Sequence, residues 1–216
     1  MKIGIIGTGM VGSTLGTKLV QMGHEVKMGS RSANNEKATA WVKTSGAKAS
    51  QGTFADAAAF GEVVFNCTKG EVSIEALKLA GEKNLDGKVL VDVGNPLDFS
   101  KGMPPFLTPS LSNTHSLGEE IQKTFHGAKV VKALNTMNCL LMVNPKLVPG
   151  DHDLFICGND AAAKTKVTEI VKSFGWPEVL DLGDITAARA TEMLLPIWVR
   201  LMMKYGNPNF NFKIVK

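Results

Sequence analysis

The sequence predicts an α/β protein with a doubly wound, mainly parallel sheet of about eight strands and a C-terminal helix. Two observations predict this class. Short apolar runs rich in β-branched residues alternate with longer segments whose apolar residues have helical spacing. A glycine-rich turn joins the first apolar run to the first helical segment. We expect the whole chain, 1–216, to form a single domain, with residues 186–216 as a helical appendage.

The composition is that of a folded protein and excludes several function classes. Apolar residues make up 44% of the chain and charged residues 20%, which excludes intrinsic disorder. The net charge is +4 without a basic cluster, and there is a single tyrosine, so no nucleic-acid partner is expected. A modestly anionic small ligand suits this charge better.

The cysteines and apolar stretches indicate a cytoplasmic protein. Cys67, Cys139 and Cys157 are far apart, which predicts buried thiols in a reducing compartment and neither a disulfide framework nor a metal site. Glycines interrupt the first apolar stretch, 3–15, and weaken it as a signal peptide. The late apolar run, 193–203, is too short to span a bilayer, so no membrane partner is expected.

The first thirty residues have the pattern of a strand–helix–strand unit. Residues 3–6 are a continuous apolar run, which is typical of a strand buried on both faces. Residues 10–22 place Val11, Leu15, Leu19 and Met22 on one stripe of a helix. A Gly-His turn then leads into a second strand at 25–28.

The same alternation continues to the C-terminus. Strands are expected at 47–50, 63–67, 88–92, 128–134, 154–157 and 179–182, and helices at 36–44, 73–80, 116–125, 160–174 and 186–205. Ser116 and Glu119 form a capping-box pattern, Asp160 is a helix cap, and Pro196 interrupts the last helix. The loop from 95 to about 113 is longer than a usual connection, which favours a functional role.

The strongest functional motif is the run Gly7, Thr8, Gly9, Met10, Val11, Gly12. It follows a predicted strand and opens a predicted helix, which is the context that a dinucleotide-binding Rossmann turn requires. Gly7 permits the tight turn, Gly9 lets the backbone approach a diphosphate, and Gly12 lets helix and strand pack closely. The alternative is a glycine-rich turn without a ligand.

The end of the second strand indicates which dinucleotide is bound. NAD-binding proteins usually place an acid there to hold the ribose 2′-hydroxyl. This strand ends in Ser30 and Arg31 instead. A guanidinium can form a charge-assisted fork with a 2′-phosphate, and the Ser30 hydroxyl can donate a further bond, so NADP(H) is predicted over NAD(H). Lys37 either assists or belongs to a solvated helix face.

Small polar residues at three other strand ends are candidates for the nicotinamide site. Thr68 and Lys69, Asn95, and Asn135 follow three predicted strands, and ligands in this fold bind beyond the carboxyl ends of the strands. The alternative for these residues is a loop cap or an Asx-turn. His115 is the best candidate for a general acid, the alternative being an exposed loop histidine.

The absence of a clear acid–base apparatus favours a particular acceptor. Hydride transfer to a carbonyl leaves an alkoxide that requires a nearby proton donor. A flavin-like ring spreads the charge, and the protein need only hold two rings together. The sequence therefore favours a flavin-like acceptor and leaves catalytic residues unassigned apart from the candidate His115.

Several segments together resemble a known family. Residues 2–9, the Gly29-Ser30-Arg31 tip, residues 131–136 and the last helix with Arg189 and Glu192 resemble the NADP oxidoreductase, coenzyme-F420-dependent family. That family includes archaeal NADPH:deazaflavin reductases and is related to the oxidoreductase domain of STEAP ferric reductases. The resemblance implies that Thr8 to Val11 wrap the pyrophosphate, that Ser30 and Arg31 hold the 2′-phosphate, and that Thr68, Asn95 and Asn135 flank the nicotinamide.

The resemblance also implies an activity and an assembly. It implies hydride transfer between NADP(H) and F420, a flavin or a similar planar acceptor, by a homodimer. The turn at 67–70 and the loop after Asn95 depart from the family pattern where the acceptor would bind. An NADPH-binding sensor without turnover, and an imine or carbonyl reductase using His115, are the alternatives. The last helix either packs on its own sheet or forms a dimer seam.

Overall fold

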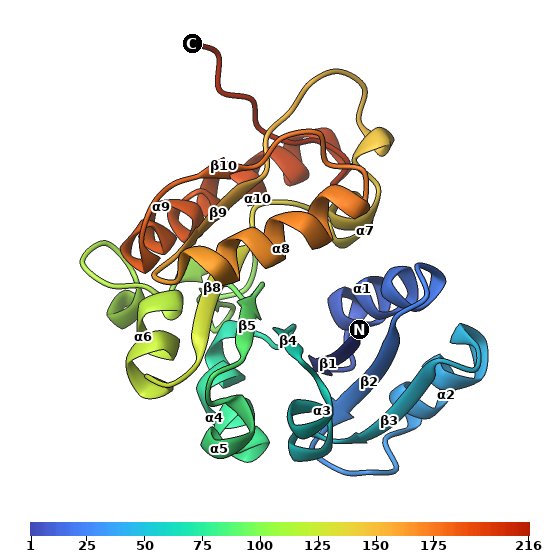
Figure 1. Ribbon diagram of the computed structural model, residues 1–216. Helices are drawn as coiled ribbons and strands as arrows, with labels where there is room; N and C mark the ends of the chain where they lie inside the picture. Colours follow the sequence, from blue (N-terminus) through green and yellow to red (C-terminus); the bar gives the residue numbers. More distant parts are fainter.

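Eight strands form one sheet in the computed structural model, which describes residues 1–216. Their order across the sheet is β10-β9-β8-β5-β4-β1-β2-β3 (Figure 1). The strands are β1 (Lys2–Ile6), β2 (Glu25–Ser30), β3 (Ala49–Thr53), β4 (Val63–Asn66), β5 (Val89–Asp92), β8 (Lys129–Ala133), β9 (Phe155–Gly158) and β10 (Leu180–Asp181). The predicted doubly wound, mainly parallel sheet is confirmed.

The six neighbouring strands β3, β2, β1, β4, β5 and β8 are parallel to one another, and β9 is antiparallel to β8. The sequence of β3, β2, β1, β4, β5 and β8 is the strand order of a dinucleotide-binding fold, in which the order reverses between β1 and β4. The carboxyl ends of these six strands therefore lie along one edge. This edge carries the polar residues that the sequence singled out.

Helices cover both faces of the sheet. One apolar core contains residues of α1 (Met10–Gln21), α2 (Glu36–Ser45), α7 (Cys139–Val143) and α8 (Ala161–Ser173). The other contains residues of α3 (Phe54–Phe60), α4 (Gly70–Ala80), α5 (Glu82–Leu85), α6 (Leu117–Thr124) and α9 (Ala188–Met193). Figure 1 shows these helices around the sheet, with α10 (Leu195–Tyr205) following α9.

The central strands β4 and β5 are apolar except for their last residues, Asn66 and Asp92, because both of their faces are buried. In β4, Val63 and Phe65 belong to one core and Val64 to the other. In β5, Val89 and Val91 face the first core and Leu90 the second. A strand covered on both faces has no solvent side, so its sequence has no polar alternation.

Three helices and a small hairpin are absent from the sequence prediction. Helices α3, α5 and α7 have four to seven residues, and such short segments carry little periodic signal. The loop after Asn95 contains the two-stranded pair β6 (Leu97–Asp98) and β7 (Phe106–Leu107), followed by a 3₁₀ turn at Pro109–Leu111. The terminal helix, which the sequence predicts to be interrupted at Pro196, consists of two helices, α9 and α10, with Pro196 in the first turn of α10.

The predicted capping box at α6 forms only in part. The Ser116 hydroxyl accepts a hydrogen bond from the Glu119 backbone amide at 3.1 Å, as a helix cap does. The Glu119 carboxylate does not return to the Ser116 amide; it accepts a bond from the Ser116 hydroxyl at 2.7 Å and pairs with Arg189. A guanidinium from α9 therefore takes the place of the reciprocal capping bond.

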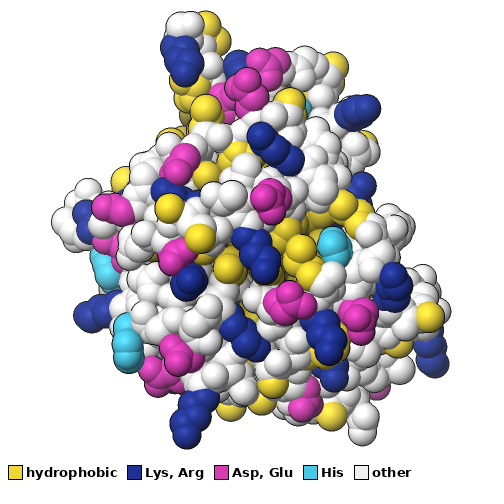
Figure 2. Space-filling view, viewed as in Figure 1, with side chains coloured by type: hydrophobic (Ala, Val, Ile, Leu, Met, Phe, Trp, Pro, Cys, Tyr) yellow, Lys and Arg dark blue, Asp and Glu magenta, His cyan; other side chains and the backbone are white.

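The surface and the C-terminus complete the fold. Lys or Arg side chains and Asp or Glu side chains are mixed over the face in Figure 2, which is typical of a solvated surface. Beyond α10 the chain returns to the loop before β9, where the Asp153 amide donates to the Phe212 carbonyl at 2.9 Å. None of the helices has both the length and the apolar character needed to cross a bilayer.

Candidate functional site at the carboxyl edge of the sheet

The turn between β1 and α1 can be made only with glycines. Gly7 has φ of +119°, and a Cβ on it would lie 2.9 Å from the Cys67 carbonyl oxygen. A Cβ on Gly12 would lie 2.3 Å from the Gly7 carbonyl oxygen, so any side chain there would push the helix away from the turn.

Gly9 differs from the other two glycines because open space lies in front of it. No atom is found within 4 Å of the position that its Cβ would take. Gly9 is also the N-cap of α1, and no side chain caps that end of the helix. The first backbone N–H groups of α1 are therefore free to bind an anion, and the space over Gly9 fits a diphosphate.

Arg31 lies at the tip of β2, beside this turn, and is exposed and free of ion pairs. It lines a cavity of about 250 Å³ together with Phe54, Thr68, Val72, Glu75, Ala76 and Leu79. The adjacent Ser30 is buried, and its hydroxyl donates to the Ser32 carbonyl at 2.5 Å. Ser30 therefore shapes the turn that carries Arg31, and its expected role as a donor to the ligand stays a prediction.

Thr68 lies in the same cavity as Arg31, at the end of β4. Its hydroxyl donates to the Asn66 side-chain oxygen at 2.7 Å and lies 2.8 Å from the Ser73 hydroxyl. Lys69 is the N-cap residue of α4, and its exposed ammonium is 3.9 Å from the Glu71 carboxylate. Thr68 therefore lines the Arg31 cavity, while Gly70, the residue after Lys69, packs against the Asn95 backbone, where a Cβ on Gly70 would lie 2.2 Å from the Asn95 carbonyl oxygen.

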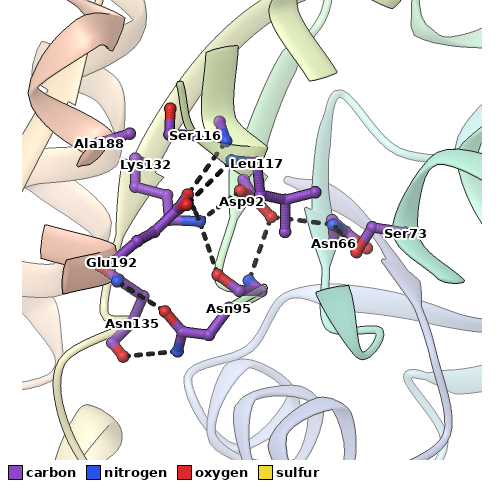
Figure 3. A network of polar contacts seen from close by, with 12 residues as sticks. Asn66, Ser73, Asp92, Asn95, Ser116, Leu117, Lys132, Asn135, Ala188 and Glu192 are labelled. Atoms are coloured by element: carbon purple, nitrogen blue, oxygen red, sulfur yellow. Dashed lines mark hydrogen bonds and ion pairs between the residues drawn. The ribbon is translucent and has the colours of Figure 1, made fainter. Parts of the chain in front are cut away.

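Asn95 and Asn135 are brought together by the ends of β5 and β8. The Asn95 amide donates to the Asn135 backbone carbonyl at 2.8 Å, and the Asn135 amide donates to Asn95 Oδ1 at 2.9 Å (Figure 3). Asn135 Oδ1 accepts no hydrogen bond from the chain. Leu134 has φ of +65°, a strained value for a leucine, and strain of this kind is concentrated at functional sites.

A buried ion cluster lies directly beneath this amide pair. Lys132 in β8 has no exposed surface on its side chain, and its ammonium is 2.7 Å from Asp92 Oδ2 and 2.7 Å from Glu192 Oε1. Asp92 Oδ1 accepts a bond from the Asn66 amide at 2.9 Å. Asp92 and Lys132 were not predicted as site residues from the sequence. Their charges inside otherwise apolar central strands could have indicated a site, because charged residues are rarely buried without a partner.

The charges of this cluster stabilise one another. Burial alone would lower the pKa of Lys132, but the facing carboxylates of Asp92 and Glu192 raise it above its usual range. Burial raises the pKa of Glu192, and the Lys132 ammonium opposes that effect. Glu192 also accepts bonds from the Leu117 amide at 2.9 Å and the Gly118 amide at 3.1 Å, at the positive end of α6.

His115 lies just before α6 and contacts two carboxylates of that helix, not the amide pair. Its Nε2 is 2.8 Å from Glu120 Oε2, and its Nδ1 is 3.8 Å from Glu119 Oε2. No hydrogen bond joins it to Asn95 or Asn135. A role as general acid therefore has no geometric support and stays a prediction.

The cysteine thiols near the site are not activated as nucleophiles. Burial is the main cause that raises the pKa of the Cys67 thiol, with the Asp92 charge adding to it. Burial likewise raises the pKa of Cys157 to about 12. All three cysteines are free thiols, and no group of His, Cys, Asp and Glu side chains has the arrangement of a metal site. The edge can bind and orient a ligand, but it offers no nucleophile.

Glu119 gives a prediction for the pH dependence of stability. Burial would raise its pKa, but hydrogen bonds from Arg189 and Ser116 lower it below the usual value. A carboxylate with a lowered folded pKa stabilises the protein above its unfolded pKa, and the contribution is lost as pH falls through the folded pKa. Glu119→Gln should lower the thermal midpoint by about 2–4 °C at pH 7. The difference from the native chain should vanish near pH 3, as measured by calorimetry from pH 7 to 3; a constant difference would contradict this.

Taken together, the strand order, the glycine turn and the cation at the tip of β2 define a dinucleotide-binding α/β protein. Residues 2–96 match the profile of the family described as NADP oxidoreductase coenzyme F420-dependent. A solved structure from Arthrobacter sp. FB24, described as a candidate F420-dependent NADP reductase, is 52% identical and covers all of both chains with a TM-score of 0.94. The chain belongs to this family.

Two curated relatives agree with this assignment. The F420-dependent NADP reductase of Methanocaldococcus jannaschii is 29% identical over 161 residues, which are 74% of this chain and 70% of the relative. Metalloreductase STEAP3 of Rattus norvegicus is 34% identical over 203 residues, 91% of this chain. The chain spans 38% of the length of STEAP3. Membership of this family identifies the chain as an NADP-dependent oxidoreductase, with NADP(H) as its cofactor.

Proposed function

We propose that this protein transfers hydride between NADP(H) and a planar ring acceptor, which is the deazaflavin F420 or a flavin. The observation that carries the proposal is the neutral amide pair of Asn95 and Asn135. It can orient a nicotinamide, and neither partner can deliver a proton. An acceptor whose ring delocalises the incoming charge does not need such a donor.

The glycine turn and Arg31 would hold the adenosine half of the cofactor. The free N–H groups at the start of α1, in the segment from Gly7 to Gly12, would bind the diphosphate over Gly9. Arg31 would pair with the 2′-phosphate, and the apolar wall of its cavity would contact the adenine. Because Thr68 lines this cavity, we propose it and the neighbouring Lys69 for the adenosine half and not for the nicotinamide.

Asn95 and Asn135 would hold the nicotinamide half. When bound, NADPH supplies the hydride, and the chain supplies only binding and orientation. The free Oδ1 of Asn135 can accept a bond from a carboxamide N–H, and the second N–H of Asn95 Nδ2 can donate to a carboxamide oxygen. The pair therefore presents an acceptor and a donor that complement a primary amide.

The nature of the acceptor is supported by the relatives and by the site. The relative from M. jannaschii and the Arthrobacter structure are both described as F420-dependent reductases. The Cys67 thiol has a raised pKa, His115 is bound to Glu120, and the Lys132 ammonium is buried between two carboxylates, so none of these groups is a free proton donor at the amide pair. This combination suits a ring acceptor better than a carbonyl or imine.

A panel of acceptors tests the proposal. Purified protein with NADPH should reduce F420, FMN or riboflavin, followed by the loss of NADPH absorbance, and should not reduce simple aldehydes, ketones or imines. No oxidation of NADPH with any ring acceptor would contradict it. Tight NADPH binding without turnover would then indicate a binding module that senses the cofactor.

We further propose that the chain acts as one NADP-binding unit, with residues 186–216 as its appendage, in the cytoplasm and as a homodimer. The dimer seam would lie on α10, where Ile197 and Met203 are about half exposed. Ile197→Asp should shift the protein from dimer to monomer in light scattering. A native protein that is monomeric would contradict this assembly.

A further inference from the structure

The turn that carries Asn95 is held on both sides by the buried ion cluster. The Gly94 amide donates to Asp92 Oδ1 at 3.1 Å, and the Lys132 ammonium donates to the Gly94 carbonyl at 2.6 Å. Both polar groups of the residue before Asn95 are thus fixed by the pair of Asp92 and Lys132. The position of the Asn95 backbone depends on this pair.

The register of β5 and β8 places the cluster symmetrically beneath the amide pair. Asp92 and Lys132 are directly opposite each other in the two strands. Asn95 lies three residues beyond Asp92, and Asn135 lies three residues beyond Lys132. The ion pair therefore joins the same two strands just below the level at which the amides join them.

Glu192 extends the cluster to two helices. It pairs with Lys132 from α9, and its two oxygens accept the Leu117 and Gly118 amides at the start of α6. Three elements, β5, β8 and α9, thus meet at one buried ammonium, and α6 joins them through Glu192 (Figure 3). Because a shift of Lys132 away from either carboxylate would leave that buried charge without its cation, a displacement of these elements is costly.

Stability alone is a poor explanation for such a cluster. Burial of charges is costly, and well-packed apolar residues of similar volume are often equally stabilising or better. A fixed geometry is a better explanation, since charge-assisted bonds define the positions of the groups that make them. The group most directly fixed here is the turn of Gly94 and Asn95.

We propose that Asp92, Lys132 and Glu192 are positioning residues that align the Asn95–Asn135 pair with the carboxamide of the nicotinamide. The inference rests on the proposed function, because it requires the nicotinamide to lie at this pair. It predicts that the cluster controls the nicotinamide half of the cofactor and leaves the adenosine half unchanged.

Glu192→Gln tests this with two ligands. The substitution keeps the shape of the side chain and one oxygen for the α6 amides, but removes the charge that faces Lys132. NADPH should bind about tenfold more weakly by calorimetry, whereas 2′,5′-ADP, which lacks the nicotinamide half, should bind within about twofold of the native chain. Asp92→Asn should give the same pattern and serves as an independent variant if Glu192→Gln folds poorly.

Glu62→Gln is the matched control. Glu62 lies just before β4, at the opposite edge of the sheet, where it accepts a bond from the Lys2 amide. This variant removes the same charge and should bind both ligands as the native chain does. If turnover is measured, Glu192→Gln should raise KM for NADPH and leave KM for the acceptor unchanged.

The outcomes separate this inference from the proposed function. If Glu192→Gln and Asp92→Asn bind NADPH with native affinity, or if their affinities for NADPH and 2′,5′-ADP fall equally, the positioning role is wrong and the proposed function stands. If the native chain reduces no ring acceptor but the two ligands respond differently to the variants, the proposed acceptor is wrong and the positioning role stands. If the native chain binds no NADPH, both are overturned.

Discussion

Lys132→Met should lower the free energy of unfolding by about 3–5 kcal/mol, because it leaves the carboxylates of Asp92 and Glu192 buried without their cation. The side chains are of similar length, so the loss is mainly electrostatic. Chemical unfolding at pH 7 measures it. The loss should shrink as pH is lowered, since burial already raises the pKa of Glu192 and a protonated carboxyl needs no cation.

A neutral version of the cluster is the control for this prediction. The triple variant Asp92→Asn, Lys132→Met, Glu192→Gln contains no buried charge and should recover much of the lost stability. A single Lys132→Met variant that loses less than about 1 kcal/mol would show that the ammonium is not the partner on which the two carboxylates depend.

Arg31→Asp should weaken NADPH binding by about 1.5–3 kcal/mol, which is about 10- to 150-fold in Kd. Arg31 forms no ion pair within the chain and lines the cavity at the tip of β2. Its substitution therefore leaves no carboxylate of the chain without a cation. An aspartate there would repel a 2′-phosphate. Binding of NADH, which lacks that phosphate, should not weaken, and calorimetry with both nucleotides measures the difference.

Lys123→Asp provides the same change of charge far from this cavity. Lys123 is exposed in the last turn of α6, at the opposite edge of the sheet. Its substitution should leave NADPH affinity within about twofold of the native value. If both variants weaken NADPH equally, the effect comes from net charge and Arg31 is not the 2′-phosphate ligand.

Local patterns in the sequence predicted most of the fold. The strands could be predicted because most of their residues are apolar on both faces. The turn after β1 could be predicted because its conformation and close contacts require glycine at Gly7 and Gly12. The predicted pairing of strand ends also placed Asn95 and Asn135 at one edge. Short helices such as α3 were missed because they have too few residues to show a period.

The buried cluster could not be predicted in the same way. Asp92, Lys132 and Glu192 are separated by 40 and 60 residues; the strand order brings Asp92 and Lys132 together, and the packing of α9 adds Glu192. Ser30 illustrates a second limit, because its hydroxyl donates to the carbonyl of Ser32 two residues away, a local bond that the residue type alone did not predict. Hydroxyl groups have local partners that a residue type does not reveal.

The most direct test of the cofactor site is the affinity of the native chain for NADPH and NADH, measured side by side by calorimetry. With Arg31 at the end of β2 and no acid there, NADPH should bind at least about tenfold more tightly than NADH. Equal affinities, or no binding of either nucleotide, would contradict the assignment of the glycine turn and Arg31 to an NADP(H) site.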